Sequence, residues 1–293
     1  KEYLKLYNLG YALLERVEKC AAYVNEHIEP PSTDEEFFLI MMYGAMLVDA
    51  AGLLLKELKI KSPYQKGEQI SYCYFADVCE NQNLQFNDGT IPTDKELWEY
   101  IRALSFAHPF ETSHPQFLEK GEIQYSPAII ANIKPEFLPV DAEPTIGILV
   151  YSTAFPEIKV LNIPYMRILD YISSRYQLLA LGTERIKQII AEKKQEWVKQ
   201  KVQIGANAID TLKSAMSIME KRHEETALGE LVLLLEVQST FEENRLQIRA
   251  YQSKIESAIP QIVTFVESLD TDGLNNYLEQ ILQVTKPKYS GAD

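Results

Sequence analysis

The stretch FFLIMMYGAMLVDAAGLLL (Phe37–Leu55) is the longest apolar segment of this chain, and it decides the fold class. Asp49 interrupts it, and charged residues bound it on both sides. Because no uninterrupted apolar run reaches about 18 residues, we expect no transmembrane helix. The segment instead predicts a buried helix that runs to about Lys59, at the centre of a helical bundle.

Further helical patterns lie on both sides of this segment. Residues 3–28 repeat apolar positions every three or four residues, which predicts an amphipathic helix. DKELWEYIRALSFA (residues 94–107) predicts another helix, which Pro109 would end. Residues 166–201 predict a long helix with a break at Gly182. The sequence therefore indicates a mainly α protein.

Two segments depart from this helical pattern. Residues 117–144 are rich in proline, have no clear period and predict an irregular insertion. TIGILVYS and EIKVLNIPY, near residues 145–165, are rich in β-branched residues and predict a β-hairpin. Aromatic residues become rare after Gly205, so we expect one domain over residues 1–204 and a helical C-terminal region over 205–293 with a short polar tail. In that region we expect a long helix over 208–258, followed by shorter ones from Pro260 onward.

Composition excludes several classes of function. The formal net charge of −13 argues against a general nucleic-acid coat, although a local basic cleft remains compatible with RNA binding. Three cysteines without CxxC spacing and only four histidines predict neither a disulfide framework nor a metal site. No phosphate-binding loop, dinucleotide fingerprint or HExxH pattern occurs, so no cofactor is expected. The cysteine content and the absence of a signal-peptide pattern favour the cytoplasm.

The pattern with chemical content is Arg102-x5-His108, at the end of the helix over residues 94–107. A continuous helix would place these two side chains on different faces. A break near Ala107, for which Pro109 supplies the reason, would turn His108 back toward Arg102. Asp49 is a lone acid in an apolar helix, and an acid buried there needs a partner. Arg102 on a neighbouring helix is a candidate for that partner.

The segment RALSFAHPFET and its helical context resemble the HEPN superfamily, in which an Arg-x4–6-His motif lies on a four-helix bundle. The resemblance covers roughly residues 1–200 and is to bacterial HEPN proteins of phage defence and abortive infection. It departs from many active members in one position, because Ala103 stands where they have a polar residue.

The resemblance implies a metal-independent endoribonuclease of a phage-defence or toxin system. In such enzymes two protomers bring their motifs together, and the RNA 2′-OH attacks the adjacent phosphate. His108 would then exchange the proton and Arg102 would bind the phosphate. Such systems also imply an antitoxin or regulatory protein as a partner, and no membrane.

Two other interpretations of the motif remain open. In the first, a helical module binds RNA or a protein without cleaving anything. In the second, the motif is structural, so that Arg102 pairs with Glu99 or Asp94 and His108 is favoured at a helix C-terminus by the helix dipole.

Further residues are supporting candidates with weaker signals. Asp49 and Tyr43 on the apolar helix, and Thr112 and His114 in the loop after the motif, are candidate members of the site. The segment TERIKQIIAEKKQEWVKQK is locally basic, and its tryptophan can stack on a base. Solvated Glu–Lys pairs are the alternative interpretation of this segment. Its candidates for RNA binding are Lys187, Lys193, Lys194, Trp197 and Lys201.

Overall fold

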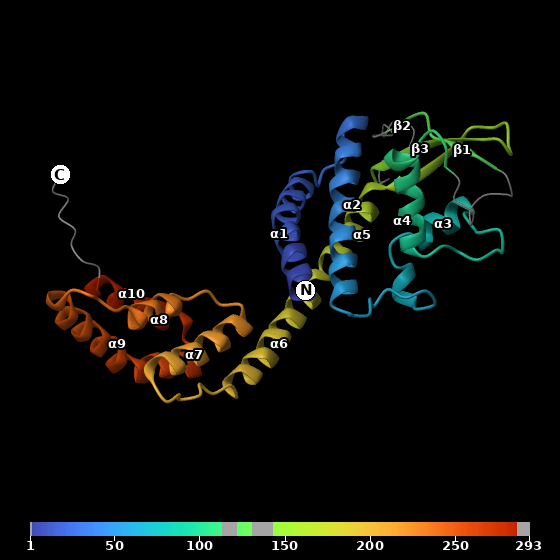
Figure 1. Cartoon of the computed structure of the whole chain (residues 1–293). Coiled ribbons are helices and arrows are strands. Elements are labelled where there is room, and N and C mark those ends of the chain that lie inside the picture. Colours follow the sequence, from blue (N-terminus) through green and yellow to red (C-terminus); the bar gives the residue numbers. More distant parts are fainter. Residues whose placement is uncertain (1, 113–121, 131–142, 286–293) are drawn as a thin grey trace, which may run out of the picture. The chain divides into compact units, whose positions relative to one another are not determined.

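The computed structural model describes residues 2–112, 122–130 and 143–285 of the protein (Figure 1). The chain is mainly helical with one small antiparallel sheet, so the predicted fold class is confirmed. It forms two compact units, residues 1–186 and 187–293. The division falls within helix α6 (Leu179–Val198), and the change of composition near Gly205 lies inside the second unit.

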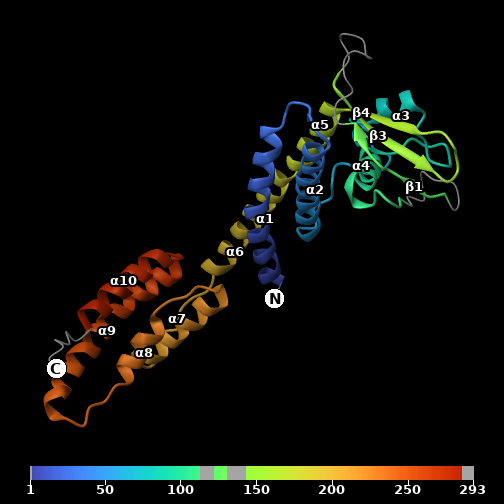
Figure 2. The same cartoon turned by 90° about the horizontal axis from the view of Figure 1, so that it is seen from above.

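The two N-terminal helices pack side by side in the first unit (Figures 1 and 2). They are α1 (Glu2–Glu26) and α2 (Asp34–Glu57). The hydroxyl of Thr33 accepts the backbone N–H of Glu36 at 3.2 Å, which caps α2. Three acidic residues in the first turn of α2 complement the helix dipole.

Helix α2 is the central core helix that the sequence predicts. By length and composition it could cross a membrane, but 50% of its most apolar window is buried inside the protein. Among the described residues it is the one helix that meets those criteria. One face packs against α1, and another packs against α5 (Tyr165–Tyr176). This burial agrees with a helix that lies in the core of the first unit.

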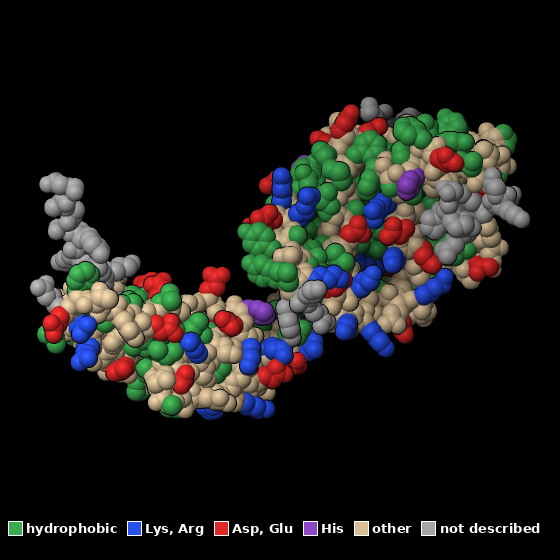
Figure 3. Space-filling view, in the orientation of Figure 1, with side chains coloured by type: hydrophobic (Ala, Val, Ile, Leu, Met, Phe, Trp, Pro, Cys, Tyr) green, Lys and Arg blue, Asp and Glu red, His purple; other side chains and the backbone are tan. Residues whose placement is uncertain are grey.

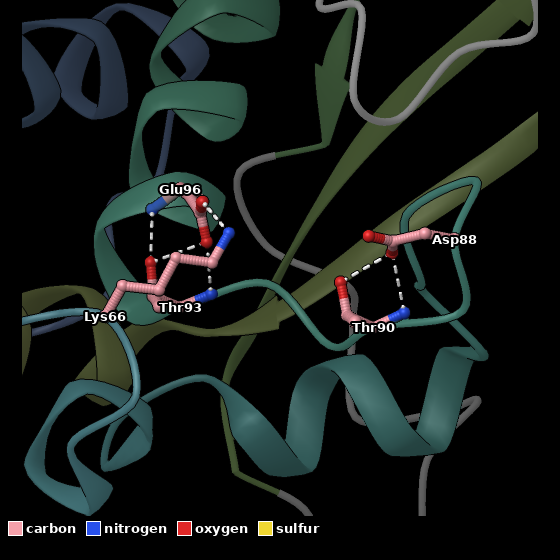
Figure 4. Close-up of polar contacts among 5 residues, drawn as sticks. All are labelled: Lys66, Asp88, Thr90, Thr93 and Glu96. Atoms are coloured by element: carbon pink, nitrogen blue, oxygen red, sulfur yellow. Dashed lines mark hydrogen bonds and ion pairs between the residues drawn. The ribbon is translucent and has the colours of Figure 1, made fainter.

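Helix α4 (Asp94–Arg102) begins at a capping box that Figure 4 shows. The Thr93 hydroxyl accepts the backbone N–H of Glu96 at 3.3 Å, and the Glu96 carboxylate accepts the backbone N–H of Thr93 at 2.9 Å. Lys66 adds an ion pair to Glu96 at 3.0 Å. In the preceding turn, the Asp88 carboxylate accepts the backbone N–H of Thr90 at 2.9 Å. These bonds fix the start of the helix that carries the motif.

The first residue of α4 also holds the segment before it. Asp94 is buried, and its carboxylate accepts the backbone N–H groups of Cys73, Tyr74 and Phe75 at 2.9 to 3.0 Å. These three residues connect the short 3₁₀ helix η1 (Gln69–Tyr72) to α3 (Ala76–Gln82). Asp94 is therefore not available to Arg102, contrary to one of the structural alternatives.

The predicted β-hairpin is confirmed as β3 (Thr145–Ser152) and β4 (Lys159–Pro164). β1 (Gln124–Tyr125) and β2 (Ile129–Ile130) pair with β3 in antiparallel register, at Gln124↔Ser152 and Ile129↔Ile148. The inward-facing side chains of the hairpin join the core of α2, α4 and α5. These hairpin residues are Ile146, Ile148, Val150, Leu161 and Ile163.

The helix predicted over residues 166–201 is interrupted at a different place from the one expected. α5 ends at Tyr176 and α6 begins at Leu179, so the break lies at Gln177 and Leu178. The prediction of a break at Gly182 is wrong. Gly182 lies inside α6, where an added Cβ would come within 2.4 Å of the Leu54 side chain. Its small size therefore serves close helix packing rather than a break.

The second unit contains α7 (Ala208–Arg222), α8 (Leu228–Glu236), α9 (Glu242–Ser268) and α10 (Thr271–Thr285) around their own apolar core. The long helix predicted over residues 208–258 is thus three helices, and Pro260 lies inside α9 instead of beginning a new one. Buried Arg222 donates to the backbone carbonyls of Val266 and Trp197 at 2.7 and 3.1 Å. It thereby ties the end of α6 to α7 and α9.

Candidate functional site

Arg102 is the last residue of α4, and its side chain is 29% exposed. Its Nη1 lies 3.4 Å from Oδ2 of Asp49 on α2 and 3.7 Å from Oε2 of Glu99, one turn earlier on α4. The guanidinium carbon also lies 5.9 Å from the centre of the Phe106 ring. The contact between Arg102 and Asp49 that the sequence predicts is present, but Asp49 is 58% exposed rather than buried.

The residues after Arg102 form a π-helical turn over Ala103–Ala107. The backbone N–H of His108 donates to the carbonyl of Ala103 at 2.9 Å, so the turn closes over five residues instead of four. We expected Pro109 to break the helix near Ala107. The structure instead shows a widened helical turn that ends at His108. π turns of this kind recur at functional sites.

His108 leaves the helix with φ −144° and ψ 51°, and its side chain is exposed. Among the described residues, no hydrogen bond or ion pair joins its imidazole to another side chain, and none joins it to Arg102. Within this one chain the two motif residues are therefore neighbours along an irregular helix end and not a bonded pair. The imidazole is open to a ligand or to a second molecule.

A buried threonine stabilises the loop that follows His108. Thr112 is 2% exposed, and its hydroxyl donates to the backbone carbonyl of His108 at 2.7 Å. Its backbone also pairs with Gln124 in both directions, at 2.8 and 3.1 Å. The Tyr100 hydroxyl of α4 donates to the Gln124 side chain at 2.5 Å. Thr112 therefore positions the backbone of His108 and does not present its hydroxyl to a ligand.

The remaining predicted members of the site have different surroundings. The Tyr43 ring packs against Tyr23 of α1, with ring centres 4.5 Å apart, and contacts neither motif residue through any bond among the described residues. His114 lies outside the residues that the structure describes. The site that the geometry brings together is thus Arg102 with Asp49 and Glu99, and His108 with Thr112 behind it.

The five residues predicted to bind RNA, from Lys187 to Lys201, belong to the second unit. Lys193 forms an ion pair with Glu196 at 2.6 Å, and Lys201 forms one with Glu267 at 2.9 Å. Lys187 and Lys194 are exposed, and Trp197 is half-buried, with its carbonyl bonded to Arg222. Glu–Lys pairing, the alternative interpretation, is thus observed at Lys193 within this helix.

Comparisons with other proteins were made for the whole chain. No protein-family model, no curated protein and no solved structure matches it. In the described part of the chain, no group of three or more His, Cys, Asp and Glu side chains is placed to hold a metal ion.

The sequence reasoning missed a buried arginine close to the site. Arg175 of α5 is 6% exposed and stacks against the rings of Tyr64 and Tyr171, at 3.4 and 4.4 Å from the ring centres. The signal that could have found it is the basic residue within the apolar face of YMRILDYISSRY. Arginine is almost never fully buried unless it has a partner.

Proposed function

We propose that this protein is a metal-independent endoribonuclease of the HEPN type. The observation that supports the proposal most is the end of α4, where a half-buried arginine precedes a π turn that presents an exposed histidine. The resemblance of this segment to the HEPN motif assigns the same two residues. We further propose that the protein acts as a homodimer in the cytoplasm, in phage defence or a toxin system. Its three unpaired cysteines agree with that compartment.

The reaction that fits these groups is transesterification of RNA. In it the 2′ oxygen forms a bond to the adjacent phosphorus, and the bond from phosphorus to the 5′ oxygen breaks. His108 takes the proton of the 2′-OH, and His108 of the second copy gives a proton to the leaving 5′ oxygen. The products are a 2′,3′-cyclic phosphate and a 5′-OH end.

Arg102 has the role of phosphate ligand in this scheme. A guanidinium offers a planar fork of donors that matches two phosphate oxygens. Its two carboxylate neighbours, Asp49 and Glu99, are 58% and 41% exposed and lie at 3.4 and 3.7 Å. Ion pairs this exposed contribute only about 0–1 kcal/mol, so an RNA phosphate can compete for the guanidinium. Asp49 then serves to hold the arginine in place before RNA binds.

The test is cleavage of labelled RNA in EDTA by the wild type and two variants. We expect His108→Ala to lower the rate by roughly 10²–10⁴-fold and Arg102→Ala by roughly 10²–10³-fold. His223→Asn is the matched histidine control, because His223 ends α7 with a positive φ of 58° that asparagine tolerates. Arg167→Ala is the matched arginine control, since Arg167 forms a comparably exposed pair with Asp77. RNA left intact by the wild-type dimer, or cut equally by the His108 variant, would contradict the proposal.

A second candidate function is a noncatalytic helical interaction module, and one observation favours it. Four large apolar side chains of α1 are 62–71% exposed, which is unusual for a helix that packs on a core. Figure 3 shows hydrophobic side chains on the surface over this helix. Binding of RNA or of an antitoxin or regulatory protein without cleavage would support this candidate. The exposed residues of α1 are Leu4, Tyr7, Tyr11 and Leu14.

A further inference from the structure

A cleft of about 660 Å³ opens in the first unit between α2, the loop after it, α4 and α5. Its volume falls within the range of about 300–1,000 Å³ that small-molecule sites occupy. Its lining combines apolar side chains, among them Leu53 and Leu55 of α2, with the aromatic side chains of Tyr64 and Tyr171. No step of the proposed ribonuclease reaction uses this cleft.

Buried Arg175 lines the cleft and lacks the anionic partner that a buried arginine normally has. Among the described residues, no carboxylate lies within ion-pair distance of its guanidinium, and its Nη1 donates to Oγ of Ser174, a neutral acceptor, at 3.0 Å. The Tyr64 and Tyr171 rings stack against it. Stacking uses the faces of a guanidinium and leaves the N–H donors at its edge free to bind an anion.

The other charges around the cleft favour the same class of ligand. Lys56 and Lys95 are exposed and line the cleft with Arg175, which gives three cations. The two carboxylates on its lining, Asp49 and Glu99, both lie against Arg102. Three cations at one cleft contrast with the net charge of −13 of the whole chain.

Asp94 does not neutralise Arg175 directly. Its carboxylate accepts three backbone N–H groups, as described above, and burial raises its pKa while those bonds and the charge of Arg175 oppose the rise. Asp94 therefore interacts electrostatically with Arg175 but forms no hydrogen bond with it. The donors of Arg175 remain without an anionic acceptor.

We propose that this cleft binds a phosphate monoester with an aromatic or nucleoside body, with Arg175 as the phosphate ligand. A phosphate monoester carries about −1.5 to −2 charge at pH 7. A ligand with this charge complements the three cations of the cleft better than a ligand with a single carboxylate would. The apolar side chains and the tyrosine rings of the lining suit a planar aromatic group the size of a nucleobase. This inference does not rest on the ribonuclease proposal, since neither His108 nor RNA takes part in it.

Gly52 offers a way to block the cleft without disturbing the fold. It lies on α2 at the cleft, is exposed, and an added Cβ would meet nothing within 4 Å. Gly52→Glu would therefore place a negative charge at the cleft with little strain. Gly10 of α1 is the matched control, because an added Cβ there also meets nothing within 4 Å.

The experiment is calorimetric titration of the full-length protein with AMP, adenosine and inorganic phosphate as probes. We expect AMP to bind at least about tenfold more tightly than adenosine or inorganic phosphate, which corresponds to about 1.4 kcal/mol. Gly52→Glu should weaken AMP binding by more than about tenfold, and Gly10→Glu should leave it within about twofold. Lys95→Ala should weaken AMP binding as well, and because Lys95 is exposed this change removes one of the three cations without opening the core.

Three results would overturn the inference. They are no AMP binding at millimolar concentration, equal affinities for AMP and adenosine, or equal AMP affinity in the Gly52→Glu and Gly10→Glu proteins. RNA cleavage measured on the same samples separates this outcome from failure of the ribonuclease proposal, which depends on His108.

Discussion

Arg102 of α4 faces Asp49 of α2, with its Nη1 3.4 Å from both oxygens of that carboxylate. Since the two side chains are 29% and 58% exposed, solvent screens their attraction. We predict that Arg102→Ala and Asp49→Asn each lower the free energy of unfolding by less than about 1 kcal/mol, measured by urea denaturation. RNA cleavage should nevertheless fall with Arg102→Ala.

Arg167→Ala is the control for the effect of Arg102→Ala on stability. Arg167 pairs with Asp77 at 2.9 Å, with side chains 36% and 49% exposed, so its alanine variant should cost a similar small amount of stability. A loss above about 2 kcal/mol for Arg102→Ala alone would mark that arginine as a structural residue. The structural interpretation of the motif would then be preferred.

Thr112→Val should disturb the loop that carries His108. The buried hydroxyl of Thr112 donates to the His108 carbonyl at 2.7 Å, and valine has nearly the same shape without the donor. We expect a loss of about 1–2 kcal/mol in unfolding free energy, with faster amide hydrogen exchange at Gln124, whose N–H donates to the Thr112 carbonyl.

Thr183→Val is the matched control for that change. The hydroxyl of Thr183 also donates to the carbonyl four residues earlier, that of Leu179 at 3.1 Å, but its side chain is exposed. Its valine variant should change stability by less than about 0.5 kcal/mol. Equal effects of the two variants would show that the bond to His108 has no special importance.

The predictable parts of this fold are those that a local pattern specifies. The apolar run of α2, the period of α1 and the β-branched residues of β3 each define an element by themselves, and all three were predicted. Local propensity and burial agree in these elements.

The failures occur where packing overrides the local pattern. Gly182 and Pro260 are residues that usually end helices, yet both lie inside one, because neighbouring side chains stabilise the helix around them. The π turn before His108 includes a backbone bond from His108 to the Ala103 carbonyl, which the sequence analysis did not predict. In the candidate site, the contact of Arg102 with Asp49 was predictable from a charge in an apolar helix. The stacking of Arg175 on Tyr64 was not, because Tyr64 lies outside any helix or strand, where no periodic pattern predicts its neighbours.

The capping box of α4 should make stability depend on pH. Burial opposes ionisation of Glu96, but the backbone N–H and hydroxyl of Thr93 and the Lys66 ammonium together lower the pKa of this carboxyl below its ordinary value. A lowered pKa means that the stabilisation is present above the unfolded pKa of about 4.3 and is lost as the pH falls through the folded value. Glu96→Gln should therefore flatten the loss of stability below about pH 5, measured by urea denaturation at several pH values.

Glu80→Gln provides the control for the pH experiment. Glu80 is exposed on α3, and its side chain takes part in no hydrogen bond or ion pair among the described residues. Its variant should keep the acid-induced loss of stability of the wild type. If Glu96→Gln keeps the same slope as well, the capping box does not contribute to acid unfolding.

Gly182→Ala and Gly10→Ala should have effects of opposite sign, although both place alanine inside a helix. At Gly182 the new Cβ would lie within 2.4 Å of Cδ2 and 2.9 Å of Cγ of Leu54, so packing between α6 and α2 must shift. We expect a loss of about 1–3 kcal/mol, as for other overpacked cores. At Gly10 the new Cβ meets nothing within 4 Å, and the better helix propensity of alanine should add about 0.5–1 kcal/mol. Thermal unfolding of the two variants and the wild type measures both changes, and stabilisation by Gly182→Ala would refute the role of this glycine in close packing.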